Sequence, residues 1–379
     1  MKVLIAVRNI SYGGAEILEC RLAVALNKRQ IHTDLLSQYC LNDFDMESDK
    51  RRWQKAGVPE VIWLKAKGLF GVLFSIFRLA RIIKKNKYDY VITTNTGLDS
   101  IAALTRINCK FNHVVALHFY PTMRLSKSLR FKVRQVLIKR SAYKMYAISQ
   151  FVKQENLKFL SYDSKKVSVI FNSINIKQLT SDSKNDSKEY FQKLETDNII
   201  LYVGRLIQSK GIDLVLKVFS RIITDTDAVL VVVGDYDNNG IEDGIVGYES
   251  ELDYLINNLN LNKKVIFLGR RRDVFSIMEK SKLLIHLPSN EGFGLVLIEA
   301  VAAGLPIVSS NIGGIPEIIK KTPYSVFDLS DINSIELEVR KFLTMDDYKR
   351  KEFTDKAKEC LDFYTDDRRS LEIIEKILS

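Results

Sequence analysis

Short apolar runs rich in β-branched residues alternate with helical stretches along the chain, and this alternation constrains the fold more than any other feature. The runs have the composition and length of buried strands. A repeated strand–helix order predicts parallel sheets with helices on both faces. Strands are expected at residues 3–7, 90–94, 113–117, 144–148, 167–171, 199–203, 229–233, 264–268, 283–287 and 306–309. Helices are expected at residues 15–27, 72–85, 129–141, 213–223 and 252–259.

The strand–helix units form two series, which are separated by a polar stretch at residues 172–197 that is short of aliphatic side chains. We therefore predict an α/β protein of two Rossmann-like, doubly wound domains, residues 1–172 and 173–363. Residues 364–379 are expected to form a last amphipathic helix that packs back on the first domain. Two facing domains of this kind would place the carboxyl ends of their strands around one interdomain cleft, where ligands bind.

The composition is that of a soluble globular protein. The chain has 379 residues, of which 46% are hydrophobic and 27% are charged. Its four cysteines are scattered without paired spacing, so we expect reduced thiols in a cytoplasm rather than disulfides or a zinc site. The opening residues, MKVLIAVRN, predict a core strand rather than a signal peptide, and no apolar run is long enough to span a membrane.

The formal net charge of +11 is unevenly distributed. Residues 1–170 carry a balance of +18, and residues 101–150 hold ten basic residues and no acidic one. This asymmetry predicts an anionic partner, such as acidic lipid headgroups, a phosphorylated acceptor or nucleic acid, with a solubilising surface as the plain alternative. Residues 65–87 and 122–144 carry the basic excess. The second favours a membrane interface, whereas the first has a fuller apolar face, closer to a core helix with a basic end. Nucleic acid fits less well, since no recognition motif is present.

The segment at residues 289–319, SNEGFGLVLIEAVAAGLPIVSSNIGGIPEII, predicts a ligand site. Glu291 and Glu299 flank a Gly-Phe-Gly turn that lies between an expected strand and a helix. Free backbone N–H groups at such a helix N-terminus can hold a phosphate. A phosphate would repel the two carboxylates, so we expect them to accept hydrogen bonds from hydroxyls instead. The pattern indicates a sugar nucleotide, with its diphosphate on the amides.

Two further loops follow expected strands. Gly13 and Gly14 would expose amides close to a bound group, although a plain tight turn is the alternative and the spacing does not match a dinucleotide fingerprint. In GRLIQSKG, residues 204–211, Arg205 and Lys210 can neutralise a diphosphate and stabilise it as it leaves. The alternative there is a pair of solvated surface charges.

His118 follows the expected strand at residues 113–117 and precedes a Pro-containing loop, which suits a residue of a ligand site. A lone histidine is more often structural, and no second His or Cys is spaced to join it around a metal. Asp235 and Asp237 could hold a divalent cation on a diphosphate. Their neighbours are turn formers, which indicates an ordinary loop, and the two cations at residues 204–211 would make a metal redundant.

Taken in order, these motifs resemble the GT-B retaining glycosyltransferases of family GT4, over nearly the whole chain. The most specific element is the spacing Glu291-x7-Glu299 in EGFGLVLIEAVAAGLPIV, followed by GGIPEII. GRLIQSKG, the early GG turn, His118, AISQ and FNSIN match in order. The family transfers a sugar from a nucleotide sugar to an acceptor, keeping the anomeric configuration. The resemblance therefore implies a GT-B fold, no metal and no cofactor beyond the donor substrate.

The resemblance also implies roles for individual residues. Glu291 would contact the donor sugar hydroxyls, Glu299 would hold the ribose, and His118 would help to position the transferred sugar. Arg205 and Lys210 would clamp the diphosphate. The implied catalytic residues are Glu291, His118, Arg205 and Lys210, and the implied substrate-binding residues are Gly13, Gly14, Gly204, Gly269, Arg270, Gly292, Phe293, Gly294, Leu295 and Glu299. In this set, amides around Gly14 and Gly294–Leu295 would bind phosphate oxygens, and Gly269 and Arg270 fall where the family holds the nucleobase. The long loop after Gly234 departs from the family pattern and affects the rim of the nucleotide site.

We expect a metal-independent glycosyltransferase that moves a sugar, from a UDP-sugar in the first instance, to a lipid-linked or saccharide acceptor in bacterial surface polysaccharide biosynthesis. Its expected location is cytoplasmic and peripheral on the inner face of the plasma membrane, through basic residues in 65–144. Two alternatives stay open. A nucleotide-sugar 2-epimerase of the same fold would interconvert the donor alone. A non-catalytic protein that docks on anionic surfaces would not need Glu291 or Arg205.

Overall fold

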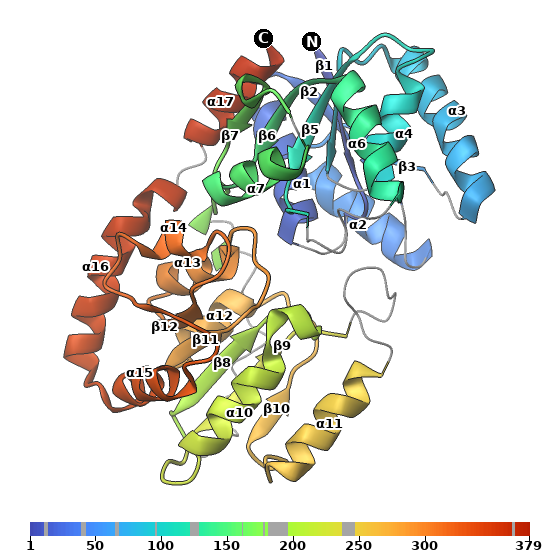
Figure 1. Ribbon diagram of the computed structural model, residues 1–379. Helices are drawn as coiled ribbons and strands as arrows, with labels where there is room; N and C mark the ends of the chain where they lie inside the picture. The colour runs from blue at the N-terminus through green and yellow to red at the C-terminus, as the bar shows by residue number, and fades with distance from the viewer. Residues whose placement is uncertain are drawn as a thin grey trace. The chain divides into compact units, whose positions relative to one another are not determined.

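The structure is a computed structural model that describes residues 1–379 except 11–13, 39–42, 65–67, 95–96, 122–128, 161, 177–178, 181–195, 237–246 and 366–367. The chain divides into two compact units. Unit 1 consists of Met1–Asn172 with Arg368–Ser379, and unit 2 consists of Ser173–Asp367. Each unit contains one parallel sheet with helices packed against it (Figure 1).

Unit 1 is built on a sheet in the order β3-β2-β1-β4-β5-β6-β7, in which the neighbouring strands are parallel. The strands are β1 (Lys2–Val7), β2 (His32–Ser37), β3 (Val61–Trp63), β4 (Tyr90–Thr94), β5 (Asn112–Leu117), β6 (Ala142–Ala147) and β7 (Val167–Val169). The order reverses between β1 and β4. This reversal is a topological switch point, and open α/β sheets bind ligands there, beyond the carboxyl ends of the strands.

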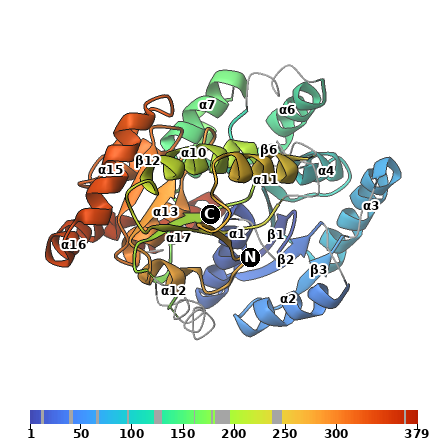
Figure 2. The same cartoon turned by 90° about the horizontal axis from the view of Figure 1, so that it is seen from below.

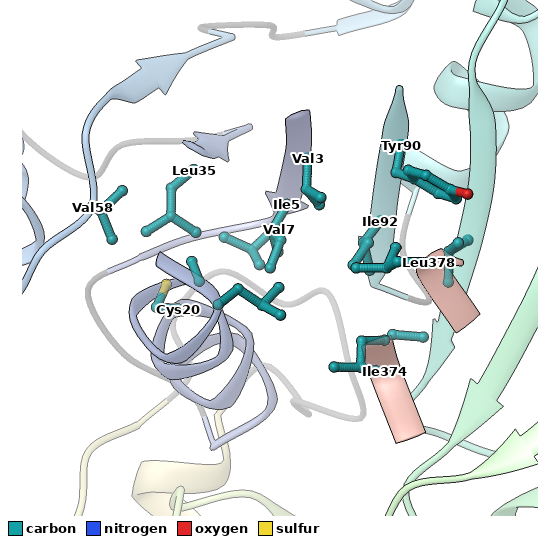
Figure 3. Close-up of a cluster of buried hydrophobic side chains, with 14 of the residues drawn as sticks. Val3, Ile5, Val7, Cys20, Leu35, Val58, Tyr90, Ile92, Ile374 and Leu378 are labelled. Carbon is teal, nitrogen blue, oxygen red and sulfur yellow. The ribbon is translucent and has the colours of Figure 1, made fainter. Parts of the chain in front are cut away.

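Helices cover both faces of this sheet. They are α1 (Gly14–Lys28), α2 (Asp43–Lys55), α3 (Gly68–Asn86), α4 (Gly97–Thr105), α6 (Leu129–Ser141), α7 (Gln150–Leu160) and α17 (Arg368–Leu378), with a 3-10 turn at Ser164–Lys166. On the α1 face, Val3 and Ile5 of β1 join an apolar cluster with α1 and α17 (Figure 3). On the other face, Leu4 packs with α3 and α4, and α6 packs beside α4. Successive residues of β1 thus enter opposite cores, as expected of a strand buried on both faces.

The expected last helix is α17, and it packs within unit 1. Its buried apolar residues are Leu371, Ile374, Ile377 and Leu378. Figure 3 shows Ile374 and Leu378 beside Ile92 of β4. Arg29 adds a two-pronged ion pair, because its Nη1 lies 3.0 Å from both carboxylate oxygens of Glu375. Apolar burial, with one ion pair at the edge, holds the helix on the sheet.

Unit 2 has a parallel sheet in the order β10-β9-β8-β11-β12-β13. Its strands are β8 (Ile199–Val203), β9 (Val229–Val233), β10 (Val265–Phe267), β11 (Leu283–His286), β12 (Ile307–Ser310) and β13 (Val326–Phe327). Its helices are η2 (Gln208–Lys210), α10 (Ile212–Ile222), α11 (Tyr248–Asn258), α12 (Val274–Glu279), α13 (Leu295–Ala302), α14 (Ile315–Ile319), α15 (Ile332–Thr344) and α16 (Asp347–Thr365). α10 packs between α11 and α15, which Figure 2 shows in one row, while α13 packs between α12 and α16. The switch point of this sheet lies between β8 and β11.

The expected strands are all present, and β4, β8 and β9 begin and end at the expected residues. β6 begins at Ala142 rather than at residue 144. The sequence analysis missed β2, β3 and β13. β2 escapes the apolar pattern because it buries the polar residues Thr33 and Asp34. β3 and β13 are edge strands of three and two residues, which are too short to show a period.

α3 differs from the expected core helix with a basic end. Leu79 and Ile83 are buried, but Leu73, Phe74 and Phe77 are 57%, 58% and 72% exposed. The helix carries apolar residues around most of its circumference, and one sheet face buries only one side of them. None of the helices in the described ranges has the length and apolarity needed to cross a membrane.

Candidate functional site

A partly buried ion pair lies at the switch point of unit 2. Lys210 follows β8 in the turn η2, and Glu291 follows β11, the neighbouring strand. Nζ of Lys210 donates a hydrogen bond to Oε2 of Glu291 over 2.9 Å, and the two side chains are only 20% and 15% exposed. The fold thus brings together two predicted site residues that are far apart in the sequence.

His286, the last residue of β11, completes this cluster. Its Nε2 lies 3.3 Å from Oε2 of Glu291. Burial lowers the pKa of His286, so the ring is neutral at pH 7. Burial alone would raise the pKa of Glu291, but the charge of Lys210 and the hydrogen bond from His286 outweigh it and hold that pKa well below its usual value. Glu291 is therefore an anion with a matched cation.

Two glycines fix the backbone that carries Glu291. Gly313 has a φ of 63°, and a Cβ at this residue would lie 1.8 Å from the backbone oxygen of Glu291. The N–H of Gly314 donates to the same oxygen over 3.1 Å, and a Cβ at Gly314 would lie 2.3 Å from the oxygen of Gly292. Only glycine tolerates such a close approach. The two glycines of the GGIPEII motif therefore pack against the backbone of the glutamate loop and fix its path.

The helix that follows this loop has an uncapped N-terminus. Gly294, with a φ of 101°, is the N-cap of α13 and provides no side-chain cap, and Leu295 begins the helix. Its first N–H groups are therefore suited to an anion. Phe293 is buried, and its N–H lies 3.4 Å from Oε1 of Glu291. Glu299 is half-buried on the same helix.

The other predicted residues of unit 2 lie on the loops after β8 and β10. Arg205 is half-buried and comes directly after Gly204. Gly234 packs against this loop so closely that a Cβ on it would lie 1.8 Å from the oxygen of Gly204. Gly269 follows β10 and accepts a hydrogen bond from the N–H of Gly234 over 2.9 Å. Next to it, Arg270 forms a half-exposed ion pair.

The partner of Arg270 is Asp235, at 3.7 Å between Nη2 and Oδ2. This pairing engages the first carboxylate of the possible cation site, and Asp237 lies outside the described residues. Within the described ranges, no group of three or more His, Cys, Asp or Glu side chains could hold a metal ion.

In unit 1, His118 directly follows β5 and is buried. Its Nε2 lies 2.9 Å from Oε1 of Glu19, a buried residue of α1. The hydroxyl of Tyr146, in β6, donates to the same oxygen over 2.6 Å. Gly14 begins α1 and is exposed, whereas Gly13 lies outside the described residues.

The sequence analysis missed three residues of these clusters. His286 interrupts the apolar run LLIHL, and Glu19 falls on the buried face of a helix. A polar or charged residue at an apolar position is a usable signal, because such residues are buried only when they are paired. Tyr146 carries no comparable signal, since tyrosine is common in strands.

The chain is similar to known proteins along most of its length. Residues 12–178 match the family described as Glycosyltransferase Family 4, and residues 182–360 match Glycosyl transferases group 1. The chain is 30% identical over 272 residues to the UDP-Gal:alpha-D-GlcNAc-diphosphoundecaprenol alpha-1,3-galactosyltransferase of Escherichia coli, covering 69% of this chain and 67% of that protein. It is also 30% identical over 158 residues to the N-acetyl-alpha-D-glucosaminyl L-malate synthase of Bacillus anthracis. That match spans 41% of this chain and only 39% of the relative.

Solved structures share the fold across the whole chain. Anabaena HepE in complex with UDP-glucose aligns with a TM-score of 0.83 at 20% identity, covering 100% of this chain and 99% of that one. The sucrose-phosphate synthase of Thermosynechococcus elongatus aligns with a TM-score of 0.80 at 18% identity, covering 100% and 98%. These likenesses confirm the expected GT-B fold of two Rossmann-like units.

Proposed function

The chain belongs to the family of glycosyl transferases group 1, and we propose that it transfers a sugar from a UDP-sugar to a lipid-linked or saccharide acceptor in bacterial surface polysaccharide biosynthesis. The observation that carries the proposal is the Lys210–Glu291 pair near the uncapped N-terminus of α13. It offers a cation and amides to a diphosphate, and a carboxylate to hydroxyls. A relative named for UDP-galactose and a diphosphoundecaprenol-linked sugar, and a fold neighbour complexed with UDP-glucose, support the choice of donor and acceptor.

In this proposal, unit 2 binds the nucleotide sugar and unit 1 faces the acceptor. Glu291 receives hydroxyls of the donor sugar, and Glu299 receives those of the ribose. Arg205 and Lys210 stabilise the charge that develops on the departing diphosphate, which removes the need for a metal. The acceptor hydroxyl enters on the face from which the diphosphate leaves, so the anomeric configuration is retained. Catalysis then rests on positioning and charge stabilisation.

The remaining predicted residues complete the proposed donor site. Backbone amides around Gly14 and Gly294–Leu295 bind phosphate oxygens, and Gly269 and Arg270 border the nucleobase. His118 positions the transferred sugar from unit 1. The Arg270–Asp235 pair supports a rim role, because both side chains are half-exposed and can rearrange around a base.

Thermal shift with UDP-, GDP- and ADP-glucose tests the donor site, because a ligand that binds the folded protein raises its melting temperature. We expect the UDP-sugar to give the largest shift, and Lys210→Ala to abolish it. Lys217→Ala is the matched control, since that lysine is half-exposed and forms only a long ion pair, at 3.9 Å, with Asp213. No shift with any sugar nucleotide, or a shift that survives Lys210→Ala, would contradict the proposal. Conversion of the donor in the absence of acceptor would favour the 2-epimerase.

We also propose that unit 1 docks on an anionic membrane surface through α3 and α6. Neither helix contains an acidic residue. The exposed side of α3 carries Leu73, Phe74 and Phe77 in its first half and the exposed cations Arg81 and Lys84 in its second. Apolar residues that enter the interface beside cations that attract lipid phosphates favour a bilayer over a nucleic acid.

Vesicle flotation tests this docking. Binding to phosphatidylglycerol vesicles is expected at low salt, and Arg81→Glu with Lys84→Glu should weaken it at least about 10-fold, since each cation near an anionic surface contributes about 1 kcal/mol. Phe77→Ser should weaken it as well, whereas Tyr254→Ser, at a 70% exposed residue of unit 2, should not. Equal binding to neutral and anionic vesicles would show that attraction between these cations and lipid phosphates does not drive the docking.

A further inference from the structure

Three of the buried polar atoms of unit 1 that have no hydrogen-bond partner among the described residues belong to side chains near one another. They are Oε2 of Glu19, Nδ1 of His118 and Oγ1 of Thr94. Buried polar atoms are nearly always hydrogen-bonded, and an unpaired one lowers stability. A group of them therefore marks a place where a hydrogen-bonding partner belongs.

The three residues lie together at the carboxyl ends of the central strands. Thr94 pairs with Ala116 across β4 and β5, and Ala116 pairs with Tyr146 across β5 and β6. His118 follows Ala116 by two residues, and side chains two apart along an extended chain share a face. α1 covers this face, and Oε1 of Glu19 accepts hydrogen bonds from both Tyr146 and His118.

The contacts determine which atoms carry hydrogens. A carboxylate oxygen can only accept, so Nε2 of His118 and the hydroxyl of Tyr146 both donate to Glu19. Burial, together with the charge of Glu19, raises the pKa of Tyr146 well above its usual value, so the phenol keeps its proton. When Nε2 carries the only ring hydrogen, Nδ1 presents a lone pair. In that form two of the three unpaired atoms are acceptors, and the Thr94 hydroxyl can do either.

We propose that Glu19 is a positioning residue, held by Tyr146, that fixes the His118 ring with Nδ1 as an acceptor for a hydroxyl of the transferred sugar. Oε2 of Glu19 and Oγ1 of Thr94 complete the same hydroxyl-binding subsite. The inference rests on the proposed function and deepens it. The bound group is a neutral polyol, because a phosphate or carboxylate would be repelled by the buried charge of Glu19.

A second carboxylate–tyrosine–histidine cluster in unit 1 shows the arrangement that a structural role requires. Oδ2 of Asp34 accepts from the hydroxyl of Tyr88 over 2.6 Å and lies 3.1 Å from Nε2 of His32. Its Oδ1 accepts from the N–H of Glu60 over 3.0 Å. Both carboxylate oxygens are satisfied within the fold, so this cluster needs no ligand. Tyr88→Phe is therefore the matched control for Tyr146→Phe.

Nuclear magnetic resonance of 15N-histidine in the full chain tests the ring directly, since there are only four histidines. His118→Asn assigns the signals. We expect hydrogen on Nε2 and none on Nδ1, a change at His118 in Glu19→Gln and Tyr146→Phe, and no change in Tyr88→Phe. Hydrogen on Nδ1 in the wild type, or His118 signals that ignore both Glu19→Gln and Tyr146→Phe, would overturn the inference whether or not the protein transfers sugar.

Monodeoxy analogues of UDP-glucose and UDP-galactose test the role in transfer. The wild type should use one analogue about 10-fold less well than its parent, which is the effect of one lost hydrogen bond. Glu19→Gln should lose this discrimination, and Asp34→Asn should keep it. If Glu19→Gln lowers kcat/KM equally for every analogue, Glu19 only stabilises the fold, and the inference is overturned. A wild type that binds no nucleotide sugar refutes the proposed function instead, and the ring measurement still decides on Glu19.

Discussion

Each unit holds a glutamate, buried in unit 1 and partly buried in unit 2, that pairs with a histidine at the carboxyl end of a strand inside its sheet. In unit 2, Glu291 also accepts a hydrogen bond from the cation Lys210. In unit 1, Glu19 also accepts one from the neutral phenol of Tyr146. The same acid–histidine pair is thus completed by a charge in one unit and by a neutral donor in the other. The first suits a site for an anionic diphosphate, and the second suits a site for uncharged hydroxyls.

The two glutamates are also held in place differently. Glu19 lies within α1, where the helical hydrogen bonds of its own segment set the direction of its side chain. Glu291 lies on a loop whose path depends on close approach to Gly313 and Gly314. Damage to the second cluster can therefore come from residues that never touch a ligand.

Lys210→Ala is expected to have the largest effect. It removes the cation that would stabilise the leaving diphosphate and leaves the partly buried Glu291 without its cationic partner. Transfer should fall by about 10²- to 10³-fold, the scale for loss of one preorganised electrostatic group. Steady-state transfer from UDP-sugar measures it. Tyr146→Phe should cost far less, and a reversed order would break the distinction between a charged and a neutral site.

Gly313→Ala should come next, with a loss of unfolding free energy of about 3 kcal/mol, because the new Cβ must displace the backbone of Glu291. Gly269→Ala is the matched control, since both glycines have a φ of 63° but a Cβ at Gly269 meets no atom within 4 Å. The control should lose only about 1 kcal/mol, from backbone strain. Urea denaturation followed by circular dichroism compares the two, and equal losses would show that the loop of Glu291 is not held by this contact.

The sequence indicated Lys210 and Glu291 together, but it indicated His118 without its partners Glu19 and Tyr146, for a physical reason. Turn chemistry is local, so glycines and charges directly after apolar runs indicated Glu291 and Lys210. The partners of Glu19 are 99 and 127 residues away in the sequence, and only the tertiary fold brings them together. The GG of GGIPEII was recognised as a motif, but its contact with the glutamate loop arises only in the tertiary fold.

The same division applies to the secondary structure. Continuous apolar runs predicted β8 and β9 to the residue, because strands buried on both faces are largely apolar, and the β-branched residues of YVITT predicted β4. β2 was missed because its Asp34 is satisfied by distant partners. The periodicity of α3 indicated a helix but not which side is covered, so the exposure of Phe74 and Phe77 emerged only from the packing.

A smaller effect is expected from pH, through the contribution of Glu291 to the stability of unit 2. The folded pKa of Glu291 lies below its unfolded value of about 4.3. The ionised carboxylate therefore adds stability above pH 4.3, and this contribution is lost as pH falls from there through the folded pKa. The gap in unfolding free energy between wild type and Glu291→Gln, about 2 kcal/mol, should be constant from about pH 8 to 5 and shrink below about pH 4. In a Lys210→Ala background the low-pH change should largely disappear, and its persistence would show that Lys210 is not the cause.

His286→Gln should have the smallest effect, which makes it the finest test of the difference between the clusters. The Lys210–Glu291 hydrogen bond at 2.9 Å remains, and the lost contact is the longer one at 3.3 Å. We expect transfer to fall by less than about 10-fold and stability by about 1 kcal/mol or less, the value of one hydrogen bond. His118→Gln in unit 1 should be more damaging, because Glu19 then loses one of its two donors and the subsite loses its Nδ1 acceptor. Kinetics of the two variants side by side decide the point. Equal losses of activity would mean that Lys210 does not make Glu291 less dependent on its histidine than Glu19 is on His118.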